Sequence, residues 1–259
     1  MVDLKRRSFF GATMAGAGAL MLSGCKGLSE TTWWPKVLES AQTLTKGAER
    51  LVAGSWAMAP EFTKADIAPE FRANGTLNPN TPDYNAMAAN GFRDWRLEIG
   101  GLVEHPLKLS LAELKAMPSR TQITRHDCVE GWSCIGEWTG TQLRLVLAKA
   151  NPLPAARYVM FYCDDPMQAT DLSAPTPYYY ESLDLVEAFH PQTLLAWQLN
   201  GRDLPIAHGA PVRVRAERQL GYKQPKYVRR IELVESFDHI NGGKGGYWED
   251  QGYSWWGGI

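Results

Sequence analysis

The chain has 259 residues, with 27 Lys and Arg against 28 Asp and Glu, which gives a formal net charge of −1. A composition of 44% hydrophobic and 21% charged residues excludes a disordered tail protein, a collagen-like repeat and a disulfide-rich miniature scaffold. The near-neutral charge argues against nucleic acid as a partner, because domains that bind phosphate backbones are usually basic. The length allows one large domain or two small ones, either with a buried core.

Residues 1–24 have the features of an export signal. Residues 6–9 read Arg-Arg-Ser-Phe, which resembles the twin-arginine motif of proteins exported in the folded state. The apolar run over 9–22 is shorter than the roughly 20 residues that a bilayer-spanning helix needs. Residues 22–25 read Leu-Ser-Gly-Cys and resemble a lipobox, so we expect a periplasmic or otherwise extracytoplasmic protein whose only membrane attachment is a lipid on Cys25. The alternative is an ordinary secretory signal in which Cys25 is incidental.

Residues 25–90 precede the main domain in our interpretation. The spacing of apolar side chains predicts a helix from Trp33 to about Leu51. Four prolines between Pro60 and Pro82 then predict an irregular segment up to Asn90 that wraps around the core.

Residues 91–236 alternate short strands and short helices without a regular βαβ repeat, which predicts a single α+β domain with mixed sheets. Ser110 and Glu113 form a capping-box signature, and Asn200-Gly201 is a strong hairpin-turn signal. The expected strands are 95–99, 122–128, 157–163, 194–199, 212–215 and 227–234, and the expected helices are 111–117, 141–149 and 182–189.

Residues 237–259 form a tail of interleaved glycine and aromatic residues that we assign to the same domain. The tail could be a ligand platform of the kind that binds carbohydrate, or an extended segment anchored against the domain. We favour anchoring near the entrance of the site.

The cysteines are compatible with several interpretations. If Cys25 carries lipid, three thiols remain at Cys128, Cys134 and Cys163, an odd number in an oxidising compartment. A Cys128–Cys134 disulfide, buried inert thiols and a metal ligand all agree with this count. Zinc fits poorly, because no CxxC pair accompanies Cys128.

Several motifs share one consistent order along the chain. They are Arg-His-Asp-Cys-Val-Glu-Gly-Trp-Ser at 125–133, Trp-Thr-Gly at 138–140, Asn-Gly-Arg-Asp-Leu-Pro at 200–205, His-Gly-Ala-Pro-Val-Arg at 208–213 and Gly-Tyr-Lys-Gln-Pro-Lys at 221–226. Together they resemble the sulfite-oxidase-like molybdopterin-dependent oxidoreductases. The form of the motifs is closest to that of the catalytic subunit of the periplasmic protein-methionine-sulfoxide reductase. The resemblance implies the sulfite-oxidase-type fold, one molybdenum bound by one molybdopterin, and two-electron oxygen-atom transfer.

The resemblance also implies roles for individual residues. Cys128 falls at the position of the metal ligand, and a soft thiolate suits a high-valent metal. Arg125 and His126 would supply positive potential or a proton, and Glu130 would lie close to the reacting atoms. The remaining positions that match cofactor contacts are Asn90, Cys163, His208, Arg213, Gln224, Pro225 and Lys226, among which the Arg213 guanidinium suits a phosphate.

The sequence says less about the substrate and the partners than about the cofactor. The Val-Glu-Gly-Trp segment after Cys128 is acidic and apolar, which argues against the sulfite dianion and favours a neutral oxygen-atom donor or acceptor such as a sulfoxide, small or protein-bound. Neither a haem domain nor a dimerisation domain is recognisable, so we expect a monomer that exchanges electrons with a separate haem or quinone-linked protein. The alternative function is a surface lipoprotein that binds a ligand or glycan through its Trp/Gly-rich tail. A zinc protein or thiol oxidoreductase is a more distant alternative.

Overall fold

The computed structural model describes residues 33–167 and 176–259. The predicted twin-arginine motif, lipobox and Cys25 therefore lie outside the described residues. The chain divides into two units, 1–52 and 53–259. Helix α2 (Trp34–Ala53) confirms the helix predicted from Trp33 to Leu51. Within the described ranges, no helix combines the length and the apolar character needed to cross a membrane.

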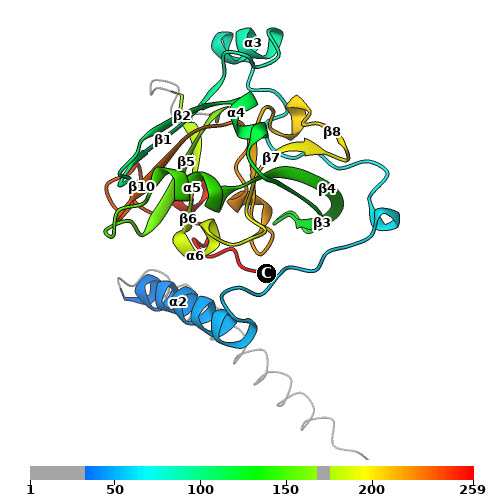
Figure 1. Cartoon of the computed structure of the whole chain (residues 1–259). Helices are drawn as coiled ribbons and strands as arrows, with labels where there is room; N and C mark the ends of the chain where they lie inside the picture. Colours follow the sequence, from blue (N-terminus) through cyan, green and yellow to red (C-terminus); the bar gives the residue numbers. More distant parts are fainter. Residues whose placement is uncertain (1–32, 168–175) are drawn as a thin grey trace, which may run out of the picture. The chain divides into compact units, whose positions relative to one another are not determined.

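A first five-stranded sheet occupies one side of the larger unit (Figure 1). Its strand order is β2 (Leu107–Ser110), β1 (Arg96–Gly101), β10 (Val228–Val234), β5 (Tyr158–Pro166) and β6 (Tyr178–Asp184). β1 and β10 run parallel and the other pairs run antiparallel. The sheet is thus mixed, as the sequence predicts.

A second sheet faces the first across the main core, and its strands and the loops beside them carry the motif segments between residues 125 and 213. Its order is β3 (Ser119–Asp127), β4 (Ser133–Gln142), β7 (Leu194–Leu199) and β8 (Arg202–Asp203), and β9 (Arg213–Arg215) also pairs with β7. The predicted turn at Asn200-Gly201 joins β7 to β8, and both residues have positive φ angles of 51° and 72°. Such angles match the two-residue hairpin turn that Asn-Gly favours.

The helices of the larger unit are short. They are α3 (Pro82–Ala89), α4 (Leu111–Ala116), α5 (Leu143–Ala150), α6 (Leu185–Ala188) and α7 (Tyr247–Asp250), with 3₁₀ helices η1 (Lys64–Asp66), η2 (Ile206–His208) and η3 (Gly221–Lys223). The predicted capping box opens α4, because the Ser110 side chain accepts from Glu113 N–H while the Glu113 carboxylate accepts from Ser110 N–H.

The main core draws on both sheets and on α5. Leu97 and Phe161 from the first sheet pack with Leu195 and Val214 from the second, and Leu147 of α5 belongs to the same fully buried cluster. A smaller cluster around Trp138 fills the space behind β4 and β7. The larger unit is therefore one α+β domain with a common core.

One predicted helix differs in part from the fold, and strand β4 and helix α3 are among the elements that were not predicted. The helix expected over 182–189 was wrong in its first turn, because 178–184 form strand β6 against β5 and only 185–188 are helical. Strand β4 was not predicted, since Gly136 and Gly140 interrupt its apolar pattern. At both glycines a Cβ would lie within 2.7 Å of a neighbour, so each allows close packing. Helix α3 was missed although Thr81 caps it and Pro82 opens it, which is a regular N-terminal signal.

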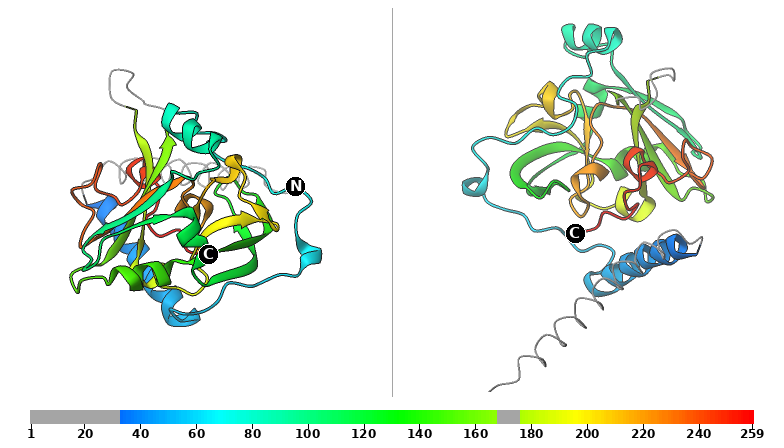
Figure 2. Two further views of the ribbon diagram at one scale, coloured as in Figure 1. Left: turned by 45° about the horizontal axis from the view of Figure 1, so that its top comes forward. Right: turned by 180° about the vertical axis from the view of Figure 1, so that it is seen from behind.

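Residues 54–80, called the strap below, run along the outer side of β3 and β4 (Figures 1 and 2). Main-chain hydrogen bonds from Phe62 N–H to Ile123 and from Ala68 N–H to Ile135 hold the strap at 2.8 and 3.0 Å. The Gln192 amide also bonds both the N–H and the carbonyl of Ala59. The strap therefore extends along the second sheet to the end of β3, where the candidate site lies.

Candidate active site

A cavity of about 250 Å³ opens where the strap, the end of β3 and the loops after β5 and β9 meet. Its walls combine segments that are far apart in the sequence, including two residues of the tail. The lining residues are Phe71, Arg72, Asn74, Gly75, Thr76, His126, Cys128, Val129, Glu130, Asp165, Met167, Tyr179, Ala207, His208, Arg213, Gly221, Tyr222, Gln224, Pro225, Lys226, Trp248 and Tyr253.

Cys128 lies in the tight turn that joins β3 to β4. Its N–H bonds the Trp132 carbonyl, and its own carbonyl accepts from the N–H of Gly131, whose φ of +84° suits glycine. The thiol is 7% exposed, and its Sγ accepts a hydrogen bond from Asn74 Nδ2 at 3.0 Å. The sulfur therefore faces the cavity with one amide donor beside it, and sulfur is the atom through which cysteine binds metals.

His126 precedes Cys128 by two residues and lines the same cavity. The imidazole is 4% exposed, and its Nδ1 lies 2.8 Å from Nη1 of Arg215. Burial lowers the pKa of His126 well below its ordinary value, and the charges of Arg215 and Arg213 lower it further. The side chain is thus neutral in the fold.

Arg213 supplies a buried cation to the wall of the same cavity. Its guanidinium donates to the carbonyls of His208 and Gln224 at 3.3 and 3.2 Å, while Nε has no hydrogen-bond partner among the described residues. Within the same part of the chain, Arg213 forms no ion pair with a carboxylate. Burial, followed by the charge of Arg215, lowers the pKa of Arg213 to about 9. This buried guanidinium has unused capacity for an anion.

Lys226 adds a second cation beside Arg213. Its ammonium donates to the carbonyls of Asn74, Thr76 and Ala207. Burial and the charge of Arg213 lower the pKa of Lys226 to about 7, although Asp165 acts in the opposite direction. Either cation is stabilised when an anion enters the cavity.

His208 and Gln224 complete this part of the site. The His208 ring lies edge-on to Phe71, with ring centroids 5.7 Å apart. Burial lowers the pKa of His208 to about 4, and Arg213 and Lys226 contribute to the shift. The Gln224 amide bonds the carbonyls of Ala216 and Gln219, which fixes the loop that ends at Pro225 and Lys226.

The structure brings together most, but not all, of the residues singled out in the sequence. Cys128, His126, Glu130, His208, Arg213, Gln224, Pro225 and Lys226 line the cavity. Arg125 is exposed and pairs with Asp127 at 2.9 Å. Asn90 caps the end of α3 and bonds Asp94 and Arg93 rather than lining the cavity. Cys163 is buried in the main core, where burial raises the pKa of its thiol well above the ordinary value.

Other lining residues were not singled out from the sequence. Asn74 stands out because it contacts Cys128 Sγ directly, yet the only local signal was an Asn-Gly turn dipeptide in the strap. Asp165 follows Cys163 near the end of β5, and burial raises its pKa while its Oδ1 has no partner among the described residues. Tyr179 comes from β6, outside the motifs, whereas Tyr222 of η3 lies within the 221–226 motif but was not itself singled out.

The aromatic tail packs against the domain and contributes to the cavity wall. Trp248 and Tyr253 stack with their ring centroids 5.2 Å apart, and Tyr222 meets Tyr253 edge-on. Lys223 anchors the tail to β6 through buried ion pairs with Glu249 and Glu181. This arrangement favours the anchored tail over an open carbohydrate platform.

The residues present fit a cofactor that contains both a metal and an anionic group. Cys128 offers a soft sulfur ligand, while Arg213 offers a buried N–H without an acceptor in the described part of the chain. Within the described ranges, no group of three His, Cys, Asp or Glu side chains is arranged to hold a metal by itself. A metal at Cys128 would therefore take its other ligands from a cofactor.

A model of the oxidoreductase molybdopterin-binding domain matches residues 84–239. The chain belongs to this family. It is also similar to individual relatives, which match very different shares of its length.

A putative protein-methionine-sulfoxide reductase subunit, YedZ1, of Azospira oryzae is 36% identical over 98% of this chain and 87% of the relative. The protein-methionine-sulfoxide reductase catalytic subunit MsrP of Xanthomonas axonopodis pv. citri is 42% identical over 54% of this chain and 45% of its own length. The chain thus spans about half the length of that relative. The solved sulfane dehydrogenase SoxCD of Paracoccus pantotrophus is 24% identical, with a TM-score of 0.47, and the match covers 56% of this chain and 39% of that chain.

Membership of the molybdopterin-binding family makes this chain a molybdenum-dependent oxidoreductase. Its cofactor is a molybdenum-molybdopterin, and its fold is the sulfite-oxidase-like molybdopterin-binding fold. These findings confirm the family, the fold class and the cofactor expected from the motifs.

The depressed pKa of His208 predicts a pH dependence of stability for the cofactor-free chain. Between pH 6.5 and about 4 the unfolded chain binds a proton at His208 that the folded chain does not. The free energy of unfolding should therefore fall as the pH drops through this window. His208→Asn should flatten that part of the curve, measured by urea unfolding at several pH values. The exposed His239→Asn is the control, and an equal slope in wild type and His208→Asn would contradict this assignment.

Proposed function

We propose that this chain is the catalytic subunit of an exported molybdoenzyme that reduces a sulfoxide, with Cys128 as the protein ligand of the metal. The observation that carries the proposal is the cavity itself, which is lined both by Cys128 and by the buried cations Arg213 and Lys226. The names of the relatives, protein-methionine-sulfoxide reductase subunits, support the substrate class.

The charge distribution near Cys128 supports a neutral substrate. The Arg72 guanidinium lies 4.8 Å from the ring centroid of Trp132, and the Trp132 indole N–H donates to Glu130 at 2.9 Å. The Trp132 side chain thus contacts one cation, Arg72, and one anion, Glu130. Their opposite charges offset each other, which suits a dipolar sulfoxide better than a sulfite dianion.

In this proposal the residues of the chain bind and orient the cofactor and the substrate. When bound, the molybdenum-molybdopterin supplies a two-electron redox centre. Asn74 holds the Cys128 sulfur by its hydrogen bond, and Arg213 and Lys226 would neutralise the anionic end of the cofactor. The stacked Trp248 and Tyr253 provide an apolar flank on which the carbon groups of a sulfoxide can pack.

The remaining parts of the proposal concern location and partner. The twin-arginine and lipobox motifs support export in the folded state and a lipid anchor at Cys25. A separate haem or quinone-linked protein would deliver the electrons, because the motifs of this chain account for one redox group only.

Cys128→Ser should lose molybdenum and sulfoxide reduction, because a hydroxyl is a poor ligand where a soft thiolate is required. Cys134→Ser is the matched control, since Cys134 packs in the cluster around Trp138 and its Sγ contacts the Glu70 carbonyl at 3.6 Å. Metal content and the rates with sulfoxides, N-oxides and sulfite are measured with artificial electron donors and acceptors. Full molybdenum occupancy and activity in Cys128→Ser, or sulfite as the preferred substrate, would refute the proposal.

Replacing Arg6 and Arg7 together by Lys should stop export, although the positive charge of the segment is unchanged. Cys25→Ser should leave export intact but release the protein from the membrane fraction, with activity retained because the cavity lies within residues 53–259. Cell fractionation followed by an activity assay measures both the loss of export and the release from the membrane. Normal export of the Lys-Lys variant would instead indicate an ordinary secretory signal.

A further inference from the structure

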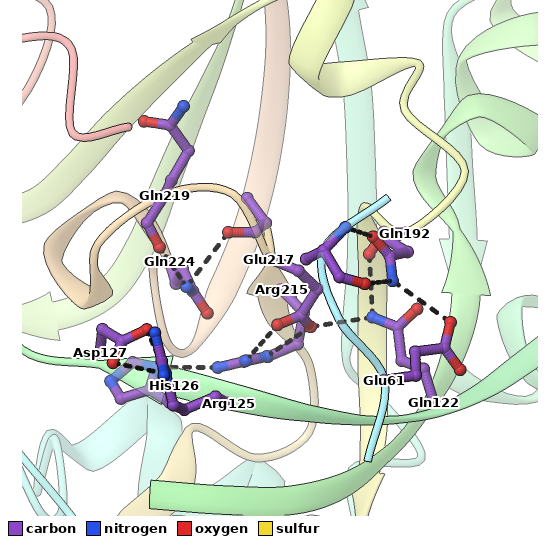
Figure 3. Close-up of polar contacts among 12 residues, drawn as sticks. Glu61, Gln122, Arg125, His126, Asp127, Gln192, Arg215, Glu217, Gln219 and Gln224 are labelled. Carbon is purple, nitrogen blue, oxygen red and sulfur yellow. Dashed lines mark hydrogen bonds and ion pairs between the residues drawn. The ribbon is translucent and has the colours of Figure 1, made fainter. Parts of the chain in front are cut away.

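A buried polar network continues inward from His126, one of the residues that line the cavity (Figure 3). It begins at His126, whose Nδ1 lies 2.8 Å from Arg215 Nη1. Arg215 continues to the Glu217 carboxylate, and Glu217 Oε1 accepts from Gln122 Nε2 at 2.8 Å. Gln122 in turn donates to the Gln192 carbonyl at 3.0 Å. His126 is the member of this chain of contacts that lines the cavity.

Arg215 is held in one orientation. Its Nε and Nη2 donate to the two carboxylate oxygens of Glu217 at 3.0 and 2.5 Å, and both side chains are fully buried. Its guanidinium also lies 4.4 Å from the ring centroid of Trp138. A bidentate ion pair against an aromatic face leaves Nη1 with one fixed direction, toward His126.

This contact determines the tautomer of His126. A guanidinium can donate hydrogen bonds but cannot accept them, so Nδ1 of His126 must be the acceptor. The single proton of the neutral imidazole is then on Nε2. Phe71 and Trp132 flank the ring, with centroids 6.0 and 5.7 Å away, and hinder its rotation.

Gly221 leaves room for the Nε2 edge of the ring. A Cβ on this residue would lie 2.6 Å from Nε2 of His126, closer than real contacts allow. Gly221, His126 and Cys128 all line the cavity. The Nε2 edge of the ring thus packs against Gly221 and near the Gln224 side chain, which lines the same cavity.

We propose that Arg215 is a positioning residue, which through Nδ1 fixes His126 as the Nε2–H tautomer so that this N–H donates to an acceptor atom of the molybdenum-molybdopterin beside Cys128. Glu217 orients Arg215 in turn. A hydrogen bond to a redox cofactor favours its reduced, more electron-rich form and so raises its reduction potential. The proposal deepens the proposed function, but its two measurements do not require the substrate to be a sulfoxide.

The first measurement identifies the tautomer by ¹⁵N NMR of the histidine side chains in the full cofactor-free chain. Wild-type His126 should show the proton on Nε2. The double variant Arg215→Met, Glu217→Gln removes both buried charges together, because an unpaired Glu217 would destabilise the fold. In this variant His126 should redistribute toward the Nδ1–H tautomer. An Nδ1–H tautomer in the wild type, or an unchanged tautomer in the double variant, would overturn the role of Arg215.

The second measurement is a redox titration of the molybdenum in the loaded enzyme, followed by electron paramagnetic resonance. The double variant should shift the midpoint potential downward at equal molybdenum content. His126→Phe leaves Arg215 and Glu217 in place and should also shift the midpoint potential downward. If the double variant does not fold, the test uses His126→Phe alone. Cys134→Ser, which lies outside the network, is the control, with the wild-type potential expected. An unchanged potential in His126→Phe would overturn the donor role.

Discussion

Burial of positive charge around one cavity is the constraint on which the structure depends. Arg215 is neutralised by Glu217, and Lys223 by Glu181 and Glu249. Arg213 and Lys226 bond only carbonyl groups among the described residues, and burial lowers the pKa of both. Asp165 and Glu217 offset these charges only in part, so an anion that enters the cavity stabilises both cations. In our proposal the phosphate of the molybdopterin provides that anion.

The fold brings together, at the cavity, four segments that are far apart in the sequence. The turn after β3 carries Cys128, β9 carries Arg213, the strap carries Asn74, and the tail contributes Trp248. Each segment is fixed by contacts remote from the cavity, such as the ion pairs of Lys223 for the tail and the main-chain bonds of the strap to β3 and β4. Because both the strap and the tail close the site, changes in either can affect the cavity without altering the sheets.

The motifs led to cavity-lining residues where those residues lie within short continuous segments of the sequence. Cys128, His208, Arg213 and Lys226 were placed by the order of their motifs, and all four line the cavity. Asn74 could not be found in this way, because its position depends on how the strap wraps around β4. Asn90 was singled out instead and caps α3. Strand β4 was missed for a related reason, since its glycines are explained by close packing against β7 that the sequence alone does not reveal.

The most direct test of the central claim is a crystal structure of the molybdenum-loaded chain, with the metal located by its anomalous scattering. We expect a metal bonded to Cys128 Sγ, with the cofactor extending toward Arg213 so that its phosphate accepts from the Nε–H. A metal bound elsewhere, or a phosphate directed away from Arg213 and Lys226, would contradict the claim.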